Sequence, residues 1–131
     1  MRYPLLSALS FALAAGACTA DEGGAPASGS LWRLDSIDGT PFAARATLGF
    51  PEPGLIAGKA PCNSYGGELT ASAPGFGIGP LRVTRMACGD LEAERQFFQT
   101  LGAMAAMETQ GDQLILSAPD GTRMVFSRAQ P

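Results

Sequence analysis

The chain has 131 residues, which is enough for one domain of ordinary size. It contains no histidine, which excludes Ser-His and Cys-His catalytic pairs and disfavours a zinc site of the usual kind. Its net charge is −3 and its cationic residues form no cluster, so we expect no nucleic-acid partner. We also expect no metal and no cofactor.

The first 17 residues have the layout of a secretory signal peptide. Arg2 supplies the positive charge, an uncharged run rich in Leu and Ala covers residues 5–15, and small residues follow. The apolar run is too short to remain in a bilayer as a spanning helix. We therefore expect residues 1–17 to be removed and the mature chain to be exported.

Cys18 follows Gly16 and Ala17 in a sequence that resembles the lipobox of bacterial lipoproteins. This resemblance implies that Cys18 is acylated, and multiple acyl chains would hold the protein stably on a membrane. Thr19, in place of Asp, implies sorting to the outer membrane, facing the periplasm of the cell envelope. The alternative is ordinary signal-peptidase cleavage, which would leave Cys18 as a free thiol at the N-terminus.

Residues 18–30 are rich in Gly, Ala and Ser and contain no large apolar side chain. Such a composition cannot bury enough surface to order itself. The sequence predicts a flexible tether over residues 18–30 and a folded domain over residues 31–128.

Short segments with strand-like alternation make up most of the domain. Turn signals separate them, including Asp38-Gly39 and the Pro-Asp-Gly sequence at residues 119–121. We expect strands over residues 31–37, 46–50, 55–60, 68–72, 76–84, 104–110, 113–117 and 122–127.

One helix is expected over residues 90–101. Asp90 is a favourable N-cap residue, and Glu92 and Glu94 place negative charge in the first turn. An apolar stripe of Leu91, Phe98 and Leu101, with Phe97 at its edge, could lie on a sheet, and Gly102 is where the helix could end. Because strands and helices do not alternate, the fold class is mainly β: a curved antiparallel sheet or incomplete barrel of about eight strands, with one covering helix.

Residues 61–67 combine a thiol, an Asn and two Gly between strand-like segments. Asn63 is interpreted as a turn residue with positive φ that bonds its own backbone. Tyr65 is interpreted as an aromatic of the core or its rim whose hydroxyl finds a backbone partner. Glu92 and Glu94 point to different helix faces and are interpreted as solvated charges.

The chain resembles the META domain (HslJ-like) family at three motifs. These are Trp-x-Leu at residues 32–34, Gly-x-x-x-Cys-Asn-x-Tyr-x-Gly at residues 58–67, and Thr-x-Met-Ala-Cys at residues 84–88. Glu94 and the terminal hairpin fit as well. The resemblance assigns Asn63, Tyr65, Gly67 and Thr84 to a structural motif. It implies a small β-rich envelope domain, often a lipoprotein, without catalytic activity and loosely associated with stress tolerance.

Cys62 and Cys88 remain once Cys18 is set aside. An even number of cysteines in an oxidising compartment favours a disulfide, and the alternative is two separate buried thiols. The two residues do not form a Cys-x-x-Cys motif, so a redox-active role is not favoured.

Two functions fit these observations. The first is a non-enzymatic structural or stress-tolerance domain of the envelope that contacts other envelope proteins. The second is a binder of a hydrophobic ligand, lipid or peptide that would contact Phe97, Phe98 and Met104. The same three side chains could equally be ordinary core.

Overall fold

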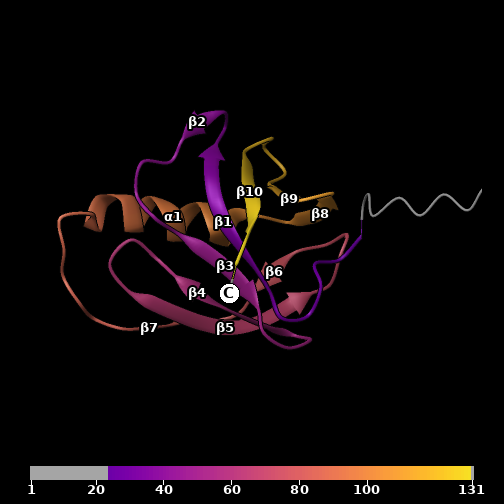
Figure 1. Cartoon of the computed structure of the whole chain (residues 1–131), viewed down its shortest axis with the longest axis horizontal. Coiled ribbons are helices and arrows are strands. Elements are labelled where there is room, and N and C mark those ends of the chain that lie inside the picture. The colour runs from indigo at the N-terminus through magenta and orange to yellow at the C-terminus, as the bar shows by residue number, and fades with distance from the viewer. Residues whose placement is uncertain (1–23, 131) are drawn as a thin grey trace, which may run out of the picture.

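The computed structural model describes residues 24–130, and the predicted signal peptide and Cys18 lie outside this range. Within it the chain forms ten strands and one helix (Figure 1). The strands are β1 (Ser30–Ile37), β2 (Thr40–Pro41), β3 (Thr47–Phe50), β4 (Leu55–Lys59), β5 (Ser64–Ala71), β6 (Gly77–Ile78), β7 (Arg82–Val83), β8 (Ala106–Gln110), β9 (Gln113–Ser117) and β10 (Arg123–Ala129), and the helix is α1 (Leu91–Ala103).

All strand pairs are antiparallel, in the order β6-β5-β4-β3-β1-β10-β9-β8, with β2 beside β1 and β7 beside β5. The sheet is open rather than closed into a barrel. Its two ends approach at one point, where Gly75 bridges Ala106 and Phe76 N donates to Ala105 O at 2.9 Å. The predicted fold class, a curved antiparallel sheet or incomplete barrel with one helix, is confirmed.

In β1, buried and exposed side chains alternate as far as Leu34, and the alternation is then interrupted. Trp32 and Leu34 point into the core, and an irregularity between Leu34 and Ser36 shifts the register so that Ile37 becomes buried. A bulge of this kind bends the strand and increases its twist. The following turn has positive φ at both Asp38 and Gly39, as a tight hairpin turn requires.

The predicted strand over residues 76–84 is two short strands, β6 and β7, that both pair with β5. The strand β5 itself begins at Ser64 rather than at residue 68. Gly66 and Gly67 therefore lie within a strand. A Cβ on Gly67 would come within 2.8 Å of the Leu81 side chain, so this glycine is needed for close packing.

The helix α1 lies on one side of the curved sheet (Figure 1). It buries Glu94, Phe97 and Leu101, whereas Leu91 is exposed. The predicted stripe was wrong at Leu91, because residues 94, 97 and 101 are the ones that share the inner face. Asp90 occupies the N-cap position without a side-chain cap bond.

The end of α1 also differs from the prediction. The helix continues through Gly102 to Ala103, and Met104 is its C-cap residue. Gly102 therefore does not end the helix. No helix within residues 24–130 combines the length and apolar character needed to cross a membrane.

The predicted flexible tether is wrong for residues 24–30. Gly24 O accepts hydrogen bonds from the backbone N and the hydroxyl of Thr109 at 3.2 and 2.9 Å, and Gly29 N donates to Phe50 O at 2.7 Å. Composition failed here because backbone hydrogen bonds to the sheet hold this segment without large side chains. The domain thus begins before residue 31.

Gly58 on β4 lies where the neighbouring strands β3 and β5 approach it closely. A Cβ at this position would overlap the backbone oxygen of Thr47 and lie 2.9 Å from the Tyr65 hydroxyl. Gly58→Ala is expected to lower the free energy of unfolding by about 1–3 kcal/mol, as overpacking does, measured by urea denaturation. Gly66→Ala is the matched control, because its Cβ would be 3.5 Å from the nearest atom. Equal stability of the two variants would contradict this packing.

Candidate functional site

The side chain of Asn63 is the centre of the motif at residues 61–67. Its amide nitrogen donates to Glu94 Oε2 at 2.7 Å and to Met86 O at 3.0 Å. Its amide oxygen accepts from the Thr84 hydroxyl at 2.9 Å and from Met86 N at 2.6 Å. An amide side chain has two donor hydrogens and two acceptor lone pairs, so all of its hydrogen-bonding capacity is used.

Glu94 connects the helix to this network. Its Oε1 accepts from Cys62 N at 3.0 Å and from Asn63 N at 2.9 Å. The residue is 7% exposed. Glu94, Asn63 and Thr84, with the backbone of Cys62 and Met86, are called the Asn63 cluster below; the cluster joins α1, the start of β5 and the loop after β7.

Two interpretations made from the sequence are wrong here. Asn63 is not a left-handed turn residue, because Asp38 is the sole non-glycine residue with positive φ among residues 24–130. Glu94 is not a solvated charge. Glu92 is a solvated charge, because its side chain is 87% exposed and forms an ion pair with Arg95 at 2.7 Å. The signal for Glu94 was its spacing from Phe97 and Leu101, which places it on the buried face.

Cys62 and Cys88 form a disulfide, with their Cα atoms 5.6 Å apart. The alternative of two separate thiols is therefore wrong. The bond links the residue before Asn63 to the loop that precedes α1. It therefore joins the same two parts of the chain as the hydrogen bonds between Asn63 and Met86. Cys88 is exposed and Cys62 is half-buried.

Thr84 and Gly67 have separate roles around the cluster. The hydroxyl of Thr84 accepts a hydrogen bond from Ser64 N at 3.1 Å while it donates to Asn63. Gly67 leaves room for Leu81 beside β5. The Thr84 hydroxyl therefore bonds the segment of residues 80–84 to β5, and Gly67 allows that segment to pack closely against the strand.

Tyr65 points into the core from β5. Its hydroxyl donates to Thr47 O at 2.6 Å, as predicted, and its ring meets the rings of Phe97 and Phe98 edge-on at centroid distances of 5.7 and 5.4 Å. Burial raises the pKa of the Tyr65 hydroxyl above its ordinary value.

This shift predicts a loss of stability at alkaline pH. In the unfolded chain Tyr65 loses its proton above about pH 10, whereas the buried hydroxyl keeps its proton. A raised native pKa stabilises the fold fully below pH 10, so the free energy of unfolding should fall by about 1.4 kcal/mol per pH unit above it. Urea denaturation between pH 8 and about 11 checks this. Tyr65→Phe should lack that slope; an unchanged slope in the variant would assign the alkaline loss to other groups.

The three predicted ligand contacts belong to the interior. Phe97 and Met104 are buried in the core, and Phe98 packs against it. None of the three lines either of the two cavities described next. The three side chains are therefore part of the core or packed against it, which is the second of the two interpretations made from the sequence.

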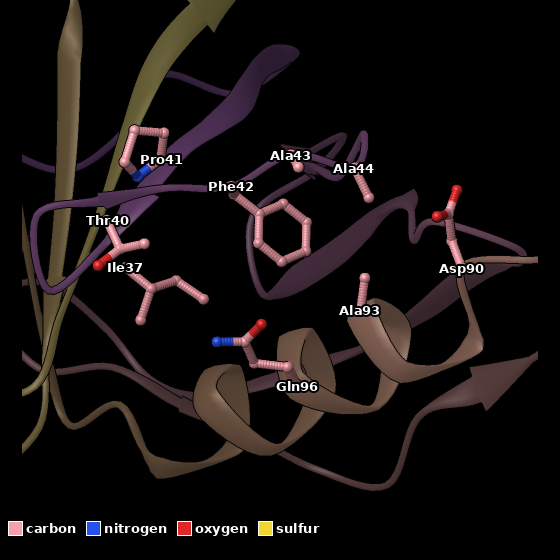
Figure 2. Close-up of a pocket in the computed structure, with 9 residues that line it drawn as sticks. All are labelled: Ile37, Thr40, Pro41, Phe42, Ala43, Ala44, Asp90, Ala93 and Gln96. Carbon is pink, nitrogen blue, oxygen red and sulfur yellow. The ribbon is translucent and has the colours of Figure 1, made fainter.

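Two of the surface cavities among residues 24–130 bear on the predicted ligand site. The first, of about 330 Å³, lies between residues 40–44 and α1, and Ala93 and Gln96 project from the helix towards it (Figure 2). The second, called the N-terminal groove, has a volume of about 250 Å³. Its lining includes Ala25 and Pro26 together with Phe50, Leu69, Ala73 and Met107.

The described residues offer no group of three His, Cys, Asp or Glu side chains placed to hold a metal ion. Every buried side-chain nitrogen and oxygen within residues 24–130 has a hydrogen-bond partner. The polar groups of the motif are therefore directed at one another and at the backbone.

Comparisons with known proteins agree with this architecture. The structure resembles an NMR structure of a protein from Burkholderia xenovorans, with a TM-score of 0.65 and 24% identity over 79% of this chain and 84% of that one. It also resembles the crystal structure of a DUF4847 family protein from Bacteroides vulgatus, with a TM-score of 0.61 and 12% identity over 79% and 95% of the two chains. At these identities the likeness concerns the fold. No curated protein matches.

The model of the META domain matches residues 25–131. The match begins within the N-terminal segment that the structure places against the sheet, six residues before the predicted domain start. The chain therefore belongs to the META domain family.

Proposed function

We propose that the chain is a non-enzymatic structural domain of the bacterial cell envelope, with a role in stress tolerance. The observation that carries this proposal is the saturated hydrogen bonding of Asn63, which uses both donors and both acceptors within the Asn63 cluster. The motif that distinguishes the sequence is thus engaged in holding the helix to the sheet. A catalytic group would need a polar atom that is free to meet a substrate.

The proposed location is the outer membrane, facing the periplasm, through lipid on Cys18. The lipobox-like sequence before Cys18 supports the anchor, and the Cys62–Cys88 disulfide fits an oxidising compartment outside the cytoplasm. Thr19 after the cysteine supports outer-membrane sorting. Envelope proteins are the proposed partners.

Mass spectrometry of the protein extracted from native membranes tests the anchor. We expect the mature chain to begin at Cys18 and to carry the added mass of acyl chains, and Cys18→Ser to move into the soluble fraction. A mature chain with an unmodified Cys18 would overturn the anchor.

Growth of a deletion strain under envelope stress tests the biological role. We expect reduced tolerance that is restored by the wild-type chain and not by Cys18→Ser. Unchanged growth of the deletion strain under every envelope stress applied would count against the role.

Binding of a hydrophobic ligand is the second candidate function. The observation that favours it is the N-terminal groove, whose walls are mainly apolar side chains. Phe97 and Met104 are core residues. The proposed ligand site is therefore the N-terminal groove and not these residues.

A further inference from the structure

The N-terminal groove is apolar and carries little charge. Its apolar lining includes Phe50, Leu69, Ala73 and Met107, and Glu52 is the one charged residue that lines it. A volume of about 250 Å³ is slightly below the range of about 300–1,000 Å³ that suits drug-sized ligands. The groove therefore suits part of one slender apolar chain. The lining includes no cation to bind a phosphate headgroup.

The described part of the chain begins beside this groove. Ala25 and Pro26 line it, and Gly24 is held to the edge of the sheet by two hydrogen bonds from Thr109. Cys18 precedes Gly24 by six residues, which span at most roughly 20 Å when extended. Any group attached to Cys18 is thus confined to the neighbourhood of the groove, at the high effective concentration that a short linker gives.

We propose that the N-terminal groove binds one acyl chain of the lipid on Cys18 of the same molecule. This inference rests on the proposed lipid anchor and adds a binding site for one of its chains. Burial of methylene groups against Phe50, Leu69 and Met107 supplies the attraction. The bilayer competes for the same chain, so the groove shields it when the protein is away from a membrane.

Photocrosslinking with a fatty acid that carries a diazirine tests this. Cells expressing the full chain incorporate the fatty acid into lipid. The protein is then purified away from membranes, irradiated, digested and mapped. We expect crosslinks from Cys18-linked acyl chains to peptides that contain Leu69, Ala73 or Met107. The intact mass of the same sample reports whether Cys18 is acylated.

Two variants and a control complete the design. Ala73→Trp fills the groove, and Pro53→Glu places a charge on its exposed rim; each should reduce the crosslink to background while Cys18 stays acylated. Ala44→Trp makes the same substitution in the other cavity and should keep the crosslink. The rim variant keeps the test valid if the Trp variant fails to fold.

The outcomes separate the two proposals. An acylated Cys18 without crosslinks to the groove, or crosslinks that persist in Pro53→Glu, would overturn the groove site alone. An unacylated Cys18 would overturn the lipid anchor and the occupant of the groove together.

Discussion

Replacing Glu94 by Ala is expected to lower the free energy of unfolding by about 4 kcal/mol, because three donors lose a charged acceptor and each such hydrogen bond contributes roughly 1.5–3 kcal/mol before relaxation. The three donors are Cys62 N, Asn63 N and the Asn63 amide. Two of them are backbone groups, which no rotation of a side chain can redirect. Urea denaturation of the Cys18→Ser background, which carries no lipid, measures the change.

Glu94→Gln should lie between the wild type and Glu94→Ala. Its amide oxygen can replace Oε1 towards the two backbone donors, but its NH₂ group then faces the NH₂ group of Asn63. Asn63 cannot simply flip, because its oxygen is already accepting from Thr84 and Met86.

Glu92→Gln and Glu92→Ala are the matched controls two positions earlier. The Glu92 side chain is 87% exposed and pairs with Arg95 at the surface, so these changes should alter stability by less than about 0.5 kcal/mol. A loss as large for Glu92 as for Glu94 would mean that general helix electrostatics, and not the Asn63 cluster, explains the effect.

Removal of the Cys62–Cys88 disulfide is the second large effect. The bond closes a loop with a sequence separation of 26 residues, and the Cys62→Ala, Cys88→Ala double variant should be less stable by roughly 3 kcal/mol. For a domain of this size the melting temperature should fall by roughly 12–24 °C. Differential scanning calorimetry measures this change.

Reduction provides the matched comparison. Wild-type protein in excess dithiol reductant should melt at the temperature of the double variant, and the variant should not respond to the reductant. Both proteins carry Cys18→Ser in these measurements, so that lipid on Cys18 does not contribute to the melting temperature. A double variant as stable as the wild type would mean that the hydrogen bonds of the Asn63 cluster suffice to hold the loop.

Local patterns in the sequence predicted the sheet well. The alternation around Trp32 and Leu34, and the turn at Asp38-Gly39, specify β1 and its end, because side-chain direction and turn conformation depend on adjacent residues. The disulfide followed from the number of cysteines and the expected compartment. These features require little knowledge of distant parts of the chain.

The features that the sequence did not predict depend on distant contacts. Gly67 is a poor strand residue by composition, yet it lies in β5, where it pairs with Ile56 and leaves room for the Leu81 side chain. Residues 24–30 lack large apolar side chains, and their order depends on bonds to Thr109 and Phe50. Asn63 reads as a turn residue from its neighbours, whereas its partners Thr84 and Glu94 lie 21 and 31 residues away.

The most direct test of the structural role of the motif is a double-mutant cycle between Asn63 and Glu94. Stability is measured by urea denaturation for Asn63→Ala, Glu94→Ala and the double variant in the Cys18→Ser background. If the two side chains act as one unit, the double variant should be more stable than the sum of the single losses predicts, with a coupling energy of about 1–3 kcal/mol. Losses that add to within about 0.5 kcal/mol would contradict the account.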